Sequence, residues 1–137
     1  MRMSCKSFPS IYGPVDEIHD EDSLRTMLNL HDHDTCADYY GHYKNCTWAV
    51  IECKSRHLRN AITQLTETVR KLRTSGKPVN KVIVIADTFG REKGFVRRDH
   101  ILYLKRGNNT KPLIIDGITV EGWQAEEIRR GTTLYDY

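Results

Sequence analysis

Two charged side chains stand at the end of an apolar stretch in the middle of the chain. Residues 48–51 (Trp-Ala-Val-Ile) are wholly apolar, and Glu52 and Lys54 follow them with one residue between. Successive side chains of a strand alternate between its two faces, so Glu52 and Lys54 share a face and Cys53 points away. A carboxylate and an ammonium group at the end of a buried strand are costly unless they are paired or bind something. The stretch therefore indicates a strand whose charged end needs a partner or a ligand.

A second carboxylate, Asp38, lies fourteen residues before Glu52. Residues 37–43 read as a partner strand, and residues 44–45 supply turn residues between the two strands. Cross-strand neighbours share a face, so the register of this hairpin decides whether Asp38 joins Glu52.

The length of the connection sets that register. A two-residue loop places Asp38 opposite Ile51, on the wrong face. A three-residue loop, or a bulge near Gly41, places Asp38 opposite Glu52. We predict one of these last two arrangements.

Together, Asp38, Glu52 and Lys54 suit the chemistry of phosphodiester hydrolysis. Two carboxylates can hold Mg²⁺, a hard cation that takes oxygen ligands and keeps several waters. The cation lowers the pKa of a bound water and stabilises charge on the phosphate. A neighbouring lysine can orient that water or balance the negative charge of the transition state.

At these residues the chain resembles the PD-(D/E)XK nuclease superfamily, which includes many restriction enzymes and archaeal Holliday-junction resolvases. The family's pattern is an acid on one hairpin strand, an acid-x-lysine on the next, and then a helix. Here the pattern is met by Asp38, by Glu52-Cys53-Lys54, and by a helix that carries Gln64. The resemblance implies a catalytic set of Asp38, Glu52, Lys54 and Gln64. It also implies that Asp38, Glu52 and the backbone carbonyl of Cys53 hold Mg²⁺ (or Mn²⁺).

The resemblance covers roughly residues 37–86, and Ala37 stands in place of the proline that gives the family its name. It implies an α/β fold with a restriction-endonuclease-like core, in which helices flank a central mixed sheet of an antiparallel hairpin plus a parallel strand. A β-rich carboxyl-terminal portion follows. The implied function is metal-dependent cleavage of DNA, as an endonuclease that acts as a homodimer.

The remaining elements are expected from periodicity and turn residues. Apolar residues at helical spacing predict a helix from about Ser55 to Arg73, ended by Gly76 and Pro78. Before the hairpin we expect irregular structure over 1–14 and an acidic segment 16–22 that leads into a short helix capped by Asp20, Asp22 or Ser23. After the long helix we expect a buried parallel strand over 81–86 and a mobile basic loop over 91–98. The remaining expectations are strands at 101–104 and 113–120, the second with a turn at 116–117, and a final helical turn over 124–129.

Several further acids are open alternatives as ligands. In the resembled family the first helix often offers another acid, and Glu17, Glu21 or Asp22 fits that role. Acids at a helix start also simply favour the helix dipole. Asp34 is a reserve for the first metal-binding acid, eighteen residues before Glu52.

Charge is distributed unevenly along the chain. Residues 1–53 carry four basic and nine acidic side chains, residues 54–111 fifteen and four, and residues 112–137 two and five. A basic middle next to an acidic site suits a polyanion lying over a bound metal, and a solvated basic face is the alternative. The residues predicted to contact nucleic acid are Arg56, Arg91, Lys93, Arg97, Arg98, Lys105 and Arg106.

Composition bounds the class of protein. A chain of 137 residues predicts a single domain, 1–137, that is able to bury a hydrophobic core without the help of disulfides or bound metals. No apolar run approaches the length of a membrane helix and no signal peptide is recognisable, so we expect no membrane partner and a cytoplasmic location, or host-cell cytoplasm for a viral or mobile-element protein. The four cysteines include no Cys-x-x-Cys pair, and we expect free thiols with Cys53 in the core.

Three other interpretations compete with the nuclease. Glu52 and Lys54 can be an ordinary pair at an exposed strand end. The fold can serve as a nucleic-acid-binding or protein-interaction module without catalysis. The stretch with His31, His33, Cys36, His42 and Cys46 can hold zinc, although its spacing matches no common zinc motif.

Overall fold

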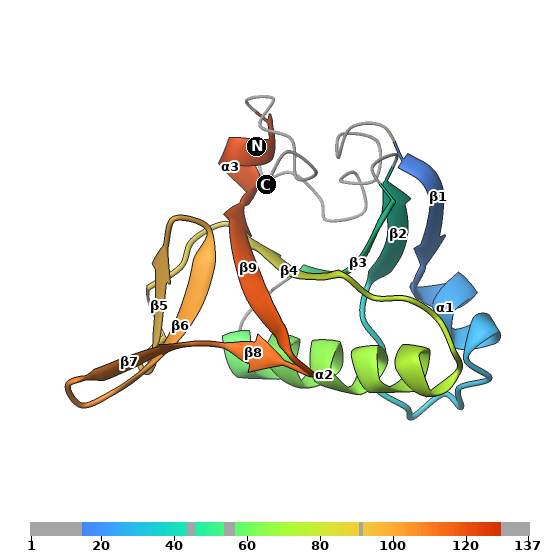
Figure 1. Cartoon of the computed structure of the whole chain (residues 1–137), viewed down its shortest axis with the longest axis horizontal. Coiled ribbons are helices and arrows are strands. Elements are labelled where there is room, and N and C mark those ends of the chain that lie inside the picture. The colour runs from blue at the N-terminus through green and yellow to red at the C-terminus, as the bar shows by residue number, and fades with distance from the viewer. Residues whose placement is uncertain (1–14, 44–45, 54–56, 91, 130–137) are drawn as a thin grey trace.

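The chain folds as an α/β protein whose carboxyl-terminal part is rich in strands, which confirms the predicted fold class (Figure 1). The computed structural model describes residues 15–43, 46–53, 57–90 and 92–129. In chain order the elements are β1 (Val15–Asp20), α1 (Glu21–Met27), β2 (Tyr39–Tyr43), β3 (Thr47–Cys53), α2 (Leu58–Thr74), β4 (Lys81–Ala86), β5 (Phe95–Arg98), β6 (Ile101–Arg106), β7 (Asn109–Pro112), β8 (Ile114–Ile115), β9 (Ile118–Gln124) and α3 (Ala125–Arg129).

The described strands form one open, mixed sheet. Its main path runs β1-β2-β3-β4-β9-β6-β5, while β7 pairs with β6 and β8 with β9. The central strands β3, β4 and β9 are parallel, and the other pairings are antiparallel. The predicted hairpin and the predicted parallel strand after the long helix are both present. Glu52 is the penultimate residue of β3, so it lies at the carboxyl end of a parallel strand, near the edge where open α/β sheets commonly bind ligands. The single domain 1–137 stays a prediction.

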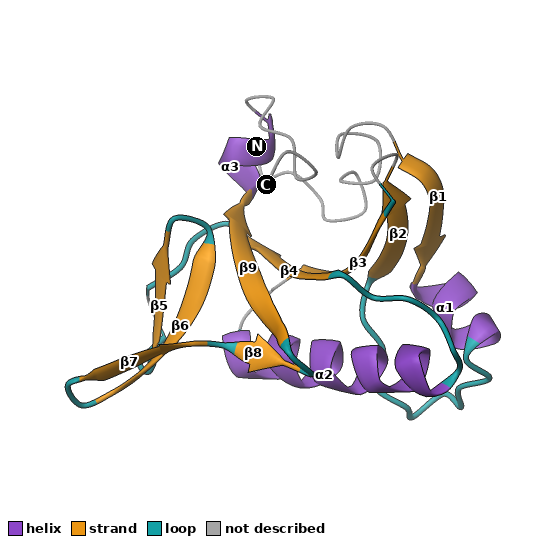
Figure 2. Ribbon diagram, in the orientation of Figure 1, coloured by secondary structure: helices purple, strands orange, loops and turns teal. Residues whose placement is uncertain are grey.

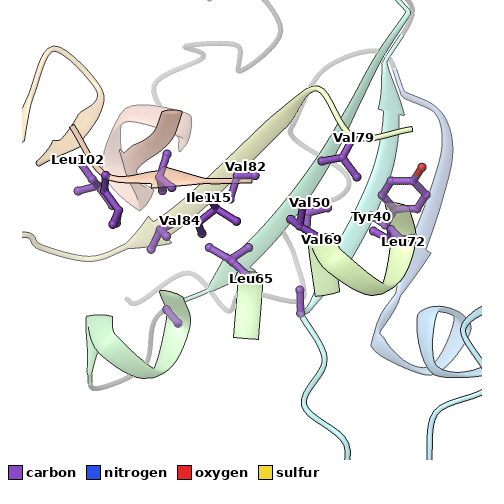
Figure 3. Close-up of a cluster of buried hydrophobic side chains, with 14 of the residues drawn as sticks. Tyr40, Val50, Leu65, Val69, Leu72, Val79, Val82, Val84, Leu102 and Ile115 are labelled. Carbon is purple, nitrogen blue, oxygen red and sulfur yellow. The ribbon is translucent and has the colours of Figure 1, made fainter. Parts of the chain in front are cut away.

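Helix α2 lies along one face of the sheet (Figure 2). Its apolar side chains meet alternate residues of the central strands, among them Val50, Val82 and Val84 (Figure 3). Asp38 and Glu52 follow the same alternation as Tyr40 and Val50, so they belong to the α2 face. The sheet-facing residues of the helix are Leu58, Ala61, Leu65, Val69 and Leu72.

The opposite face of the sheet carries a second apolar cluster. Ile51, Ile83, Ile85 and Trp123 are buried there, and Ile128 of α3 packs with them. Both faces of the central strands are therefore buried, as expected of parallel strands that read as unbroken apolar runs.

Helix α2 begins at Leu58, three residues after the predicted cap Ser55, which lies outside the described residues. A carboxylate from another segment caps it: Glu92 accepts the backbone N–H of Leu58 (N···O 3.0 Å) and of Arg59 (3.1 Å). Negative charge is favourable at this end of a helix. The helix ends as predicted, before Gly76, whose φ of 76° suits glycine.

Two segments differ from the prediction. Residues 15–20 form edge strand β1 and only then lead into α1, with Asp20 accepting the Ser23 N–H (2.9 Å) as its cap. The strand was missed because its side chains are mostly polar or acidic on both faces, which hides the two-residue period. Residues 95–98, predicted as part of a mobile loop, form β5, since pairing with β6 overrides their basic composition.

The cysteines depart from the expected free thiols in one case. Cys36 and Cys46 are free, but Cys53 is disulfide-bonded, so the prediction is wrong for Cys53. Pairing depends on which distant segments meet in the fold, and cysteine spacing does not reveal that. Disulfides are typical of oxidising compartments, so the cysteines lend no support to the predicted cytoplasmic location. None of the described helices is both long and apolar enough to cross a membrane.

Candidate active site

The hairpin register places Asp38 beside Glu52. Tyr43 pairs with Thr47, which makes the connection three residues long, as one of the two predicted arrangements requires. Tyr39 pairs with Ile51, and Asp38 is the residue before β2, so it falls opposite Glu52. The bulge near Gly41 is not needed, because the pairing of β2 with β3 is regular from end to end.

Each of the two carboxylates binds the backbone of the other strand. The Asp38 N–H donates to Glu52 Oε1 (3.0 Å), and the Cys53 N–H donates to Asp38 Oδ2 (2.8 Å). These bonds continue the hairpin ladder with side chains in place of carbonyl groups. These hydrogen bonds hold both carboxyl groups next to each other, so the backbone pairing of the two strands positions the pair.

Burial makes this pair a poor place for two negative charges. Glu52 is only 4% exposed, and Asp38 is partly buried. Burial, repulsion by Asp38 and a hydrogen bond to Asp38 raise the pKa of Glu52 to about 9. Burial also raises the pKa of Asp38, opposed by the Cys53 N–H and by the hydrogen bond from Glu52. At neutral pH the pair therefore holds a proton, and Glu52 is the group that carries it.

A third acid, Glu21 at the start of α1, acts on the pair from a distance. After the larger effects of burial, repulsion from Glu21 adds to the raised pKa of both Asp38 and Glu52. Of the three acids considered for the first helix, Glu21 is thus the one whose charge reaches both carboxyl groups. It also pairs with Arg25 (Oε2···Nε 2.9 Å), which holds its side chain along α1.

Helix α2 supports the segment that leads into Asp38. The predicted Gln64 donates from Nε2 to the Cys36 carbonyl at 3.5 Å, two residues before Asp38, so it holds the backbone next to the pair. Thr68, which sequence reasoning missed, accepts the Ala37 N–H at Oγ1 (2.7 Å) and is 1% exposed. A threonine inside the apolar stripe of α2 was the available signal.

Two of the other proposed ligand sets are not assembled. The reserve acid Asp34 accepts the His31 N–H (2.9 Å), which commits its carboxylate to its own turn. Within the described ranges, no three or more His, Cys, Asp or Glu side chains come together in a group suited to a metal ion. A zinc site built from the histidine-rich stretch therefore has no support in this part of the chain.

Some of the predicted residues cannot be placed. Lys54, Arg56 and Arg91 lie outside the described residues. For Cys53, the backbone N–H is part of the pair, and the predicted role of its carbonyl as a metal ligand stays a prediction.

The basic residues predicted to contact nucleic acid divide into two kinds. Arg97 is a structural residue: its guanidinium donates to the Gly122 carbonyl (2.8 Å), pairs with Glu127 and lies over the Phe89 ring. Arg98 is exposed and lies over the ring of Tyr103 (6.0 Å from guanidinium carbon to ring centre). Lys93, Lys105 and Arg106 are also exposed, and none of these three forms an ion pair with a described acid.

The donor set of the pair fits a hard divalent cation. Both groups offer carboxylate oxygens, and Mg²⁺ is commonly held by one or two carboxylates while it keeps several waters. Burial and then repulsion by Asp38 raise the pKa of Glu52, and a cation in place of the shared proton would offset that repulsion.

No protein-family model, curated protein or solved structure matches the chain. The resemblance to the PD-(D/E)XK superfamily stays a sequence-based expectation, carried by Asp38, the Glu52-x-Lys54 motif and the helix that follows.

Proposed function

We propose that the chain is a Mg²⁺- or Mn²⁺-dependent nuclease that hydrolyses phosphodiester bonds in DNA at the Asp38–Glu52 pair. The observation that carries this proposal is the meeting of two carboxylates at the carboxyl end of a buried strand. A stable fold does not need that arrangement, since burying the two acids together costs free energy. Binding a cation gives the arrangement a use.

Each residue of the candidate site has a distinct role in this proposal. Asp38 and Glu52 hold the cation, and the Cys53 N–H keeps the Asp38 carboxylate in position. Lys54, which the sequence predicts on the same face as Glu52, would orient the attacking water or balance charge on the phosphate. When bound, the cation supplies a water of lowered pKa and neutralises charge on the phosphate.

The remaining parts of the site act through the backbone. Gln64 and Thr68 hold the segment before Asp38, so they position the pair without touching substrate. Family resemblance suggests a homodimer in which each subunit cuts one strand, and products with a 5′-phosphate and a 3′-hydroxyl.

Cleavage of labelled DNA tests the proposal. Linear, supercoiled, single-stranded and branched DNA are incubated with the wild-type chain and Mg²⁺, Mn²⁺ or chelator, beside Asp38→Asn, Glu52→Gln and Lys54→Ala. We expect cutting with either cation, none with chelator, and loss of at least about 10²-fold in each variant while DNA binding persists. The exposed acid Glu67 on α2 gives the matched control, Glu67→Gln, which should cut normally.

Two results would reject the assignment. One is wild-type protein that binds but cuts none of the substrates with either cation. The other is cutting that survives both Glu52→Gln and Lys54→Ala, because a contaminating nuclease or a different site must then be responsible.

A further inference from the structure

Beyond Leu104, the last residue of β6 that pairs with β5, strands β6 and β7 continue as a two-stranded ribbon that extends away from the rest of the sheet (Figure 1). We call residues 105–111 the ribbon tip. Six of its seven residues are exposed, and the seventh, Thr110, is half-buried. A bare two-stranded extension is only marginally stable by itself, so its persistence at the surface suggests an interaction surface.

The ribbon tip is positively charged and carries no acid. Lys105, Arg106 and Lys111 are its charged residues, and residues 101–115 contain neither Asp nor Glu. None of the three cations forms an ion pair with a described acid. Elsewhere in the described chain, Arg73 and Arg97 do pair with acids. The tip therefore presents three solvated cations, a surface that attracts a polyanion.

The cations occupy both faces of the ribbon. Leu104 pairs with Lys111, and Arg106 pairs with Asn109, so Arg106 and Lys111 share one face with Asn109. Lys105 pairs with Thr110 on the other face. A ligand that contacts both faces of the ribbon therefore meets positive charge on each face. The two phosphate backbones that border a DNA groove are a ligand of this kind.

The width of the ribbon selects among grooves. Its turn is tight, with Gly107 at φ 59°, and its two strands are about 4.8 Å apart. The major groove of B-form DNA is about 12 Å wide and admits a two-stranded ribbon, whereas the minor groove is about 6 Å wide. The major groove of A-form RNA is too narrow for side chains to read. The dimensions favour duplex DNA and its major groove.

The ribbon lies within reach of a duplex held at the carboxylate pair. Strand β6 is three positions from β3 across the sheet, a separation of about 14 Å at about 4.8 Å per strand. The register sets Ile101 level with Ile51, and β6 runs antiparallel to β3. Lys105 therefore lies about 17 Å from the level of Glu52 along the strand direction, at about 3.3 Å per residue, and about 22 Å from it in all. One turn of B-form DNA spans about 34 Å, so one duplex can contact both places.

We propose that the β6–β7 ribbon enters the major groove of duplex DNA, with Lys105, Arg106 and Lys111 on the bordering phosphates and Asn109 at the base edges. The side-chain amide of asparagine can bond an adenine edge twice, because its NH2 group donates to N7 and its oxygen accepts from the N6 amino group. This inference rests on the proposed function for its choice of DNA, and it makes double-stranded DNA the substrate class.

Binding without cutting isolates the ribbon. A fluorescein-labelled 20-base-pair duplex is titrated with full-length protein in chelator, and anisotropy gives the affinity over a range of salt concentrations. We compare Arg106→Gln/Lys111→Gln with Arg70→Gln/Lys77→Gln, which removes one exposed cation in the last two turns of α2 and one just after the helix. The ribbon variant should lose about tenfold in affinity and about 1.8 in the slope of log K against log salt, because two phosphate contacts disappear. The control should lose neither.

Chemical protection places the ribbon in a groove. Dimethyl sulfate methylates guanine N7, which faces the major groove. Wild-type protein and the charge-preserving swap Arg106→Lys/Lys111→Arg should protect N7 within the bound site, and the ribbon variant should not. Equal salt slopes for the ribbon and control variants, or N7 protection that survives in the ribbon variant, would overturn the proposal. Failure of the wild-type chain to cut DNA would remove the nuclease function but leave both of these measurements decisive for the ribbon.

Discussion

Replacing Glu52 by glutamine should stabilise the protein while it abolishes cation-dependent activity. In the folded chain the pKa of Glu52 is about 9, against an ordinary value of 4.5. Because Glu52 binds its proton more tightly in the folded chain, the free energy of unfolding falls as pH rises between these two values. Over this range the unfolded chain has already given up the proton that the folded chain keeps. At pH 7 the loss covers 2.5 pH units at about 1.36 kcal/mol each, or about 3 kcal/mol.

Glutamine has nearly the same shape as a protonated glutamate. Its Oε1 can still accept the Asp38 N–H, and its amide can donate to the Asp38 carboxylate, so both hydrogen bonds of the pair are kept. The variant does not titrate, and it should therefore avoid the loss that Glu52 causes. Its free energy of unfolding should exceed that of the wild type by about 3 kcal/mol at pH 7 and by little at pH 4.5.

Urea unfolding without reductant, in chelator at pH 5, 6, 7 and 8, measures the effect. The difference between variant and wild type should grow with pH, and adding Mg²⁺ at pH 8 should reduce it by stabilising only the wild type. Glu67→Gln, which changes an exposed acid, is the control and should follow the wild type at every pH. A difference between Glu52→Gln and wild type that does not vary with pH would refute the shared-proton description of the pair.

Three other substitutions test the parts that position the site. Thr68→Val should lower the free energy of unfolding by about 1–3 kcal/mol and also lower activity, because the buried N–H of Ala37 loses its acceptor. Chemical unfolding measures the change in stability, and initial cleavage rates measure the change in activity. Glu92→Ala should lower the free energy of unfolding by about 1 kcal/mol, because α2 loses its cap, and a thermal melt measures the change. A melting temperature equal to that of the wild type would count against the capping role. Gly122→Ala should destabilise by about 1–3 kcal/mol, since its new Cβ would lie 2.9 Å from Leu102 Cδ2; an unchanged melting temperature would show that Leu102 moves freely.

The pair itself was predictable because it depends on local rules. Strand alternation fixes the face of Glu52, and the hairpin admits only a few loop lengths, of which the three-residue one is observed. Helix α2 and strand β4 were equally visible, since their apolar periods are strong. These elements are organised by residues close together in sequence.

The elements that were missed depend on distant partners. Strand β1 is stabilised by pairing with β2, and the cap of α2 comes from Glu92, thirty-four residues after Leu58. Strand β9 lies between β4 and β6, so the last long strand of the chain completes the parallel centre of the sheet. The spacing of Arg97 in a basic stretch gave no sign that Glu127 holds it. Only the folded arrangement reveals such contacts.

Calorimetric titration of the ligand-free protein with Mg²⁺ tests the central claim most directly. Repeating it in buffers of different ionisation enthalpy counts the protons released for each ion bound. The account predicts one site that releases about one proton at pH 7, with affinity rising about tenfold per pH unit up to about pH 9, and no such site in Asp38→Asn or Glu52→Gln. Binding without proton release that persists in both variants, or no binding at any pH, would contradict it.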